Sequence, residues 1–139
     1  MNVVLDTNVW ISGIFWKGPS HDIVKMAERG TAELHATQDM IDELFGVLQR
    51  EKFSPLFSAA ETSFREVSRH VLSLVKVHPS VEPVNAIKED PTDNKFLACA
   101  LAVRASFVVS GDAHLLDLKE WRGIDILAPH AFLEALAAA

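Results

Sequence analysis

Four acidic residues stand next to apolar segments of this sequence, where charged side chains are uncommon. Asp6 directly follows the run "VVL", and Asp112 follows "FVVSG". Asp93 opens the segment "DNKFLACALA", and Glu43 lies inside "MIDELFGVL". Taking a lone carboxylate out of water costs on the order of several kcal/mol, so acids in these places need partners. Their type and position indicate a candidate binding or catalytic cluster.

Each of these acids also has an ordinary structural explanation. Asp6 and Asp112 are good N-caps for helices that begin just after them. Asp93 would complete a capping arrangement in the segment "DPTD". Glu43 would be a solvated residue at the rim of its helix. The coincidence of all four, rather than any one of them, favours a shared cleft.

The predicted elements direct these acids toward one edge of a sheet. The β-branched run "NVVLD" predicts a strand covered on both faces, and "SFVVS" predicts another. In parallel sheets, ligands bind beyond the carboxyl ends of the strands, where the strand order reverses. Asp6 and Asp112 follow two such ends. In the helix predicted over 37–50, Glu43 lies about 40° beyond the apolar arc if each residue advances about 100°, so it borders the core.

Four carboxylates in one cleft would repel one another unless some took up protons or a cation bound between them. Oxygen ligands select hard cations, so Mg²⁺ or Mn²⁺ is expected. The six histidines are scattered and lack the spacing of a zinc-binding pair, so zinc is not expected.

Predicted strands alternate with predicted helices along the chain. The strands are expected over 2–6, 31–37, 106–110 and 124–127, and the helices over 9–15, 21–29, 37–50, 60–77, 90–105, 112–121 and 129–136. The stretch 78–90 contains two prolines and is expected to be irregular, with room for a short strand. Such alternation predicts an α/β fold, a three-layer α/β/α sandwich with a mainly parallel sheet.

The composition predicts one domain over residues 1–139, because 139 residues with a hydrophobic fraction of 49% can bury a continuous core. The single cysteine, Cys99, cannot form an internal disulfide, which fits a reducing compartment. No segment approaches the roughly 20 apolar residues that span a bilayer, and the N-terminus lacks a signal-type pattern. We therefore expect a cytoplasmic protein with no membrane association.

The net charge of −6 argues against nucleic-acid binding through a broad basic surface. Without the four acids, however, 15 acidic residues face 13 basic ones, so the rest of the chain is close to neutral. A nucleic acid could then be guided by a second subunit or by local groups such as Lys17, Arg50, Lys52 and Lys95.

Four segments, in this order, resemble the signature of the PIN domain family. They are "VVLDTNVW" near the start, "IDEL" about forty residues later, "DPTDNKFLACALA", and "FVVSGDAHLL" near the end. The resemblance covers nearly the whole chain. It is greatest to the bacterial and archaeal VapC-like ribonucleases, the toxin components of toxin–antitoxin pairs.

The resemblance implies a Rossmann-like fold and an enzyme, a divalent-metal-dependent endoribonuclease that hydrolyses phosphodiester bonds of single-stranded RNA. It implies a quartet of metal-binding and catalytic residues with Mg²⁺ or Mn²⁺ as cofactor: Asp6, Glu43, Asp93 and Asp112. Asp6 and Asp93 are expected to bind the metal directly, and Glu43 and Asp112 either form a second site or bind through water, so one ion or two are both open. Asn8 and Ser110 match neighbouring polar positions that orient the carboxylates. The implied partners are a cognate antitoxin protein and a second copy of the chain in a homodimer.

Three other interpretations compete with this one. A catalytically silent PIN-like module for RNA binding or regulation is the main alternative, although all four acids are present. A receiver domain needs an acidic pair after its first strand, and a haloacid-dehalogenase-type phosphatase needs a second Asp two residues after the first. Thr7 and Asn8 follow Asp6 instead, so neither class fits.

Overall fold

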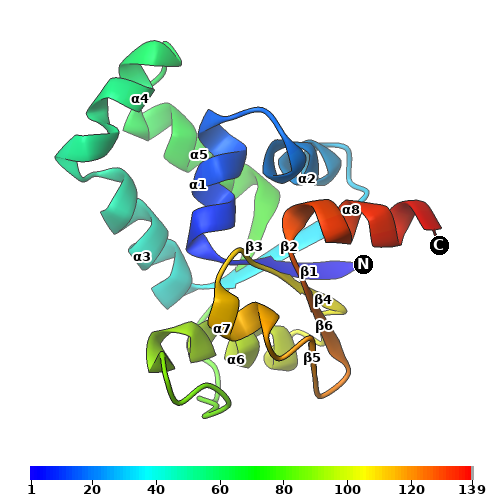
Figure 1. Ribbon diagram of the computed structural model, residues 1–139. Helices are drawn as coiled ribbons and strands as arrows, with labels where there is room; N and C mark the ends of the chain where they lie inside the picture. Colours follow the sequence, from blue (N-terminus) through cyan, green and yellow to red (C-terminus); the bar gives the residue numbers. More distant parts are fainter. Residues whose placement is uncertain (139) are drawn as a thin grey trace.

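The computed structural model describes residues 1–138, which form a β-sheet with helices on both faces (Figure 1). Within these residues the sheet has six strands in the order β3-β2-β1-β4-β6-β5. The strands are β1 (Asn2–Leu5), β2 (Glu33–Thr37), β3 (Val75–His78), β4 (Phe107–Val109), β5 (Glu120–Trp121) and β6 (Ile124–Leu127). All neighbouring pairs are parallel except β5 with β6.

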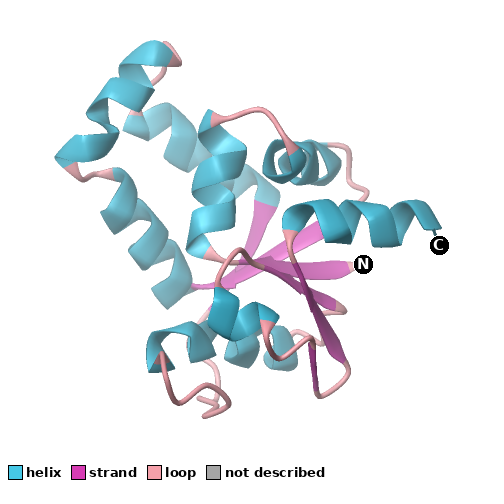
Figure 2. Ribbon diagram, viewed as in Figure 1, coloured by secondary structure: helices cyan, strands magenta, loops and turns pink. Residues whose placement is uncertain are grey.

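Helices cover the sheet in two layers (Figure 2). They are α1 (Thr7–Phe15), α2 (Pro19–Glu28), α3 (Gln38–Leu48), α4 (Ser54–Ala59), α5 (Phe64–Leu74), α6 (Asn94–Ala102), α7 (Ala113–Leu116) and α8 (Pro129–Ala138), with the 3₁₀ turns η1 (Glu51–Phe53) and η2 (Pro91–Asp93). Helices α6 and α7 lie on one face, and α1, α2 and α8 lie on the other (Figure 1). The predicted α/β/α sandwich with a mainly parallel sheet is confirmed.

The central strand β1 shows why the sheet forms at this place. Val3, Val4 and Leu5 are each at most 1% exposed, because helices cover both faces of the strand. Three β-branched or aliphatic residues in succession suit a strand that has no solvent-facing side. Burial of such side chains stabilises the fold by roughly 2 kcal/mol each.

The strand order places a reversal point between β1 and β4. The chain runs outward from β1 through β2 to β3, and then returns to the other side of β1 to form β4 and β6. The loops that leave the carboxyl ends of β1 and β4 therefore diverge to opposite faces of the sheet. A cleft at this position is the usual ligand site of an open parallel sheet.

Two predicted helices are wrong in part. The helix predicted over 60–77 ends at Leu74, and the next four residues form the edge strand β3. The stretch predicted to be irregular is confirmed, since no helix or strand lies within 79–89 of the described chain. The helix predicted over 112–121 is only a single turn, α7. The last two residues of the predicted range, Glu120 and Trp121, form β5 and pair with β6. Pairing of β3 with the distant strand β2, and the hairpin of β5 with β6, override locally continuous helical patterns.

No helix among residues 1–138 is long and apolar enough to cross a membrane.

Candidate active site

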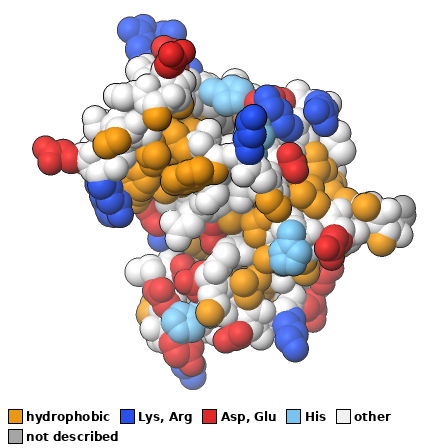
Figure 3. Space-filling model, turned by 45° about the horizontal axis from the view of Figure 1, so that its top comes forward, with side chains coloured by type: hydrophobic (Ala, Val, Ile, Leu, Met, Phe, Trp, Pro, Cys, Tyr) orange, Lys and Arg blue, Asp and Glu red, His pale blue; other side chains and the backbone are white. Residues whose placement is uncertain are grey.

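The four acids singled out in the sequence line one cleft of about 300 Å³ at the carboxyl ends of β1 and β4. Asp6 and Asp112 enter it from the loops that follow these strands, Glu43 enters from α3, and Asp93 from η2. Figure 3 shows acidic side chains gathered around a hollow in the lower left part of the face that it presents. The cleft therefore brings together side chains that are far apart in the sequence.

Asp6 is the N-cap of α1 and also lines the cleft. Its Oδ1 accepts a hydrogen bond from the backbone N–H of Val9 at 2.8 Å. Its Oδ2 accepts from the Ser110 hydroxyl at 2.5 Å and from the Gly111 N–H at 3.3 Å. Burial raises the pKa of Asp6, and these hydrogen bonds oppose the rise by stabilising the carboxylate.

Ser110 links the ends of the two central strands. It is fully buried, and its hydroxyl oxygen accepts a hydrogen bond from the Asp112 N–H at 2.9 Å while it donates to Asp6. Asp112 in turn caps α7, because its Oδ1 accepts from the His114 N–H at 2.8 Å. One hydroxyl therefore orients an aspartate from each strand.

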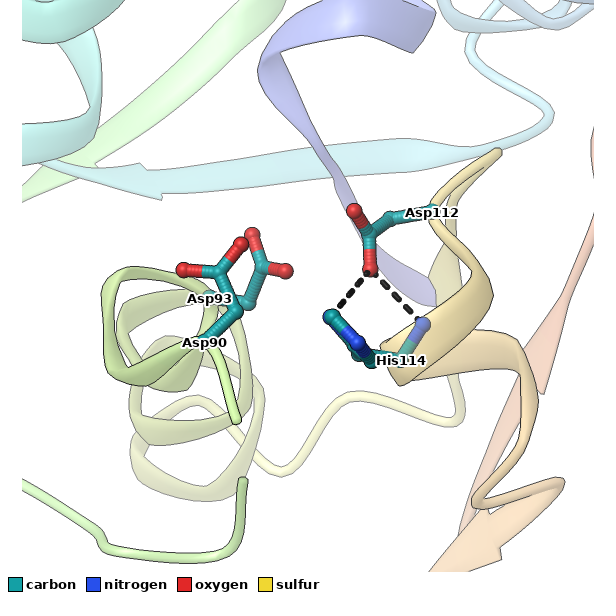
Figure 4. Close-up of side chains that lie close together, drawn as sticks. All are labelled: Asp90, Asp93, Asp112 and His114. Carbon is teal, nitrogen blue, oxygen red and sulfur yellow. Dashed lines mark hydrogen bonds and ion pairs between the residues drawn. The ribbon is translucent and has the colours of Figure 1, made fainter. Parts of the chain in front are cut away.

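Asp93 of η2 and Asp90, the residue just before η2, face Asp112 (Figure 4). Ligand atoms of Asp90, Asp93, Asp112 and His114 all lie within 4.8 Å of one another. Burial, followed by the nearby charge of Asp112, raises the pKa of Asp93 to about 7. The Thr92 hydroxyl donates to Asp90 at 2.5 Å and lowers the pKa of Asp90. Asp90 therefore ionises more readily than Asp93.

Asp93 also has an unsatisfied oxygen. Its Oδ2 is buried and has no hydrogen-bond partner among the described residues. Burying a carboxylate oxygen without a hydrogen-bond donor destabilises the fold. A cation bound to that oxygen would offset this cost. The surrounding donors are carboxylate oxygens and one imidazole, a set that suits Mg²⁺ or Mn²⁺. The residues present therefore fit a divalent cation.

Glu43 occupies a different environment at the other wall of the cleft. Its Oε1 accepts a hydrogen bond from the Thr7 hydroxyl at 3.1 Å, and its Oε2 forms an ion pair with Lys95. Asn8 is exposed and lines the same cleft. Glu43 is only partly buried, as its position at the border of the apolar arc predicts.

Two of the basic residues considered for substrate binding lie at this cleft, and two do not. Arg50, at the end of α3, and Lys52, on η1, line the cleft beside Val47 and Phe53. Lys17 lies on a separate groove with Trp16, and Lys95 is occupied by Glu43. The Lys95–Glu43 pair has no signal in the sequence, because it depends on the approach of α3 and α6.

Asp90 and His114 also belong to the aspartate cluster, although neither is one of the four acids expected there. Asp90 precedes Asp93 by one 3₁₀ turn, and His114 follows Asp112 by two residues. Both positions were apparent in the sequence, but only the packing of η2 against α7 brings them together.

A doubly wound, mainly parallel sheet with an acidic cleft at its reversal point defines a Rossmann-like α/β protein. Within that class the chain belongs to the PIN domain family, whose model matches residues 2–114. The resemblance seen in the sequence is thus confirmed. PIN domains are generally nucleases, which are hydrolases.

Two solved structures share this fold at low sequence identity. One is the crystal structure of VapBC2 from Rickettsia felis bound to a DNA fragment from its promoter, with 14% identity, a TM-score of 0.59, and coverage of 91% of this chain and 97% of the other. The second is PAE2754 from Pyrobaculum aerophilum, with 18% identity, a TM-score of 0.57, and coverage of 100% of both chains. A search of curated proteins found no match.

Proposed function

We propose that this protein is a divalent-metal-dependent endoribonuclease that hydrolyses phosphodiester bonds of single-stranded RNA. The observation that carries the proposal is the convergence of Asp6, Glu43, Asp93 and Asp112 on one cleft, where Asp93 retains a buried oxygen without a partner. Membership of the PIN domain family supports the nuclease class. Residues 1–139 act as one nuclease domain, since β6 lies beyond the matched range and pairs with β4 in the same sheet.

Asp6, Asp93 and Asp112 would hold Mg²⁺ or Mn²⁺, and Glu43 completes the acidic cleft. Bound there, the cation would supply an activated water and neutralise charge on the phosphate. Asp6 is held in place by three hydrogen bonds and Asp112 by its cap, so both carboxylates are oriented before any ligand binds. Such preorganisation avoids the cost of ordering these groups during the reaction.

The basic residues of the cleft wall would position the substrate. Arg50 and Lys52 lie on the wall formed by α3 and η1, and their charges would attract the phosphates that flank the scissile bond. A cleft of about 300 Å³ is at the small end of ligand sites, which favours a single strand over a duplex.

The protein would act in the cytoplasm as the toxin of a toxin–antitoxin pair, with a cognate antitoxin as partner and a homodimer as its assembly. The fold shared with a chain of the VapBC2 structure supports this role. A small neighbouring reading frame that encodes a DNA-binding protein would support it further.

Purified protein incubated with labelled single-stranded RNA tests the proposal. Cleavage is expected with Mn²⁺ or Mg²⁺, and a chelator or the variant Asp6→Asn should abolish it. Asp125→Asn is the matched control, because Asp125 is an exposed residue of β6 outside the cleft. RNA binding without cleavage under any metal would instead establish the silent module, and cleavage that survives both the chelator and Asp6→Asn would contradict the mechanism.

A further inference from the structure

The carboxylates of the cleft fall into two kinds. Both oxygens of Glu43 have partners supplied by the protein, since Thr7 donates to Oε1 at 3.1 Å and Lys95 pairs with Oε2. Asp93, in contrast, has a buried Oδ2 without any partner in the described residues. The charge of Glu43 is thus neutralised by Lys95, whereas Asp93 has an oxygen that a cation could bind.

Lys95 pairs with Glu43 from a second groove rather than from the cleft itself. It belongs to the first turn of α6 and lines the neighbouring groove with Thr37, Asp39 and Ser80. Its side chain is 28% exposed and that of Glu43 is 36% exposed. The pair is therefore partly removed from water, where an ion pair is stronger and less screened by salt than on an open surface.

This pair bears on the number of cations that the cleft can hold. Two-metal sites hold their ions about 3.5 to 4 Å apart, with carboxylate oxygens available to both. A second dication on the Glu43 side would have to displace the Lys95 ammonium group or lie beside it, in addition to repelling the first ion. Either outcome is unfavourable in a small, partly buried cleft.

We propose that Lys95 is a positioning residue, a built-in counter-cation that engages Glu43 and restricts the cleft to one divalent cation at the Asp6, Asp93 and Asp112 end. The inference rests on the proposed metal-dependent function and goes beyond it by assigning the fourth acid to the protein's own lysine. Glu43 is therefore not a ligand of this ion. It serves the cleft as a fixed, neutralised acid.

Titration of the full-length protein with Mn²⁺ in the absence of RNA tests this assignment. Free Mn²⁺ is measured by electron paramagnetic resonance and the binding isotherm by calorimetry. Wild type should bind one Mn²⁺. Lys95→Met should bind two, because Glu43 gains a free carboxylate, and Lys95→Arg should return to one because it restores the counter-charge.

The matched control is Lys25→Met, which removes a lysine from a lysine–glutamate pair on α2 and changes the net charge by the same amount. It should bind one Mn²⁺, as wild type does. The double variant Glu43→Gln/Lys95→Met provides a second test, because it removes both charges of the pair and leaves neither residue unpaired. It should bind one Mn²⁺, with an affinity within about threefold of wild type, because the pair has no net charge in either protein and a residue that contacts no ligand contributes little to binding.

The outcomes separate this inference from the proposed function. Two ions in wild type, one ion in a folded Lys95→Met variant, or a tenfold or greater loss of affinity in the double variant Glu43→Gln/Lys95→Met would each overturn the assignment of Lys95. Absence of Mn²⁺ binding in wild type would instead overturn the proposed metal site itself.

Discussion

The folded protein disfavours the charged form of the Asp93 carboxyl group. Burial and the charge of Asp112 raise its pKa from 3.8 to about 7. The folded state therefore binds a proton that the unfolded chain releases at lower pH. The stability that results is fully present below pH 3.8 and is lost as the pH rises through about 7.

Asp93→Asn should consequently stabilise the chelator-treated protein at pH 7.5, by about 1 to 2 kcal/mol after allowance for solvent screening at this partly exposed side chain. The variant should also flatten the decline of the unfolding free energy between pH 4 and pH 7. Urea unfolding at several pH values measures both effects. A variant less stable than wild type at pH 7.5 would show that its neighbours do not penalise the Asp93 charge.

The Ser110 hydroxyl bonds the Asp6 carboxylate and the Asp112 backbone N–H, so its loss should affect both stability and metal binding. Ser110→Ala removes the donor to Asp6 and the acceptor for the Asp112 N–H. We expect a loss of roughly 1 to 3 kcal/mol in unfolding free energy and roughly 10- to 100-fold weaker Mn²⁺ binding. Calorimetry and urea unfolding measure the two effects, with Ser106→Ala as the exposed control. Unchanged Mn²⁺ affinity would show that Ser110 does not orient the ligands.

At the scale of elements, the contact between α1 and α2 depends on a glycine. A methyl group at Gly13 would lie 2.8 Å from Val24 Cγ2 and 2.9 Å from the Ser20 carbonyl oxygen. This close approach sets the position of α1 against α2, and Asp6 is the N-cap of α1. The spacing of these two helices therefore helps to position the cleft.

Gly13→Ala should destabilise the protein by roughly 1 to 3 kcal/mol, because backbone at the contact has to move. Gly46→Ala is the matched control in α3, where nothing lies within 4 Å of the added methyl group. That variant should stabilise the protein by roughly 0.5 to 1 kcal/mol through helix propensity. Thermal unfolding compares the two variants, and equal effects would contradict the packing argument.

The elements that the sequence predicted well are those whose pattern is local. The apolar arc of α3 and the buried runs of β1 and β4 follow from residue spacing alone. Strand β3 was mistaken for the end of a helix, because Val75 continues the apolar spacing of α5. Its strand conformation comes from pairing with Leu34 and its neighbours in β2, which no local window contains.

For the whole molecule, a bound cation should act as a stabilising ligand. A ligand that binds only the folded state at 100 times its Kd adds about 2.7 kcal/mol of stability. Thermal unfolding with and without Mn²⁺ should therefore show a rise in Tm for wild type that Asp6→Asn loses and Asp125→Asn keeps. An equal rise in all three proteins would place the ion outside the cleft.

The balance of charge over the molecule leads to a prediction about RNA. With net charge −6, binding should depend on the few basic groups at the cleft rather than on a broad surface. In an Asp6→Asn background that prevents cleavage, Arg50→Gln and Lys52→Gln should each weaken RNA binding and reduce its salt dependence by about one unit of slope. Fluorescence anisotropy at several salt concentrations measures this, and Lys25→Gln should match the background.

The sequence by itself determined the α/β class, the buried strands, and the four acids at the edges of apolar segments. These features follow from hydrophobic spacing and from the cost of burying charge, both of which act locally along the chain. Only the tertiary structure decided that η2 meets α7 around Asp93 and that Lys95 pairs with Glu43. Such contacts depend on strand order and helix approach, which spacing along a single chain does not specify.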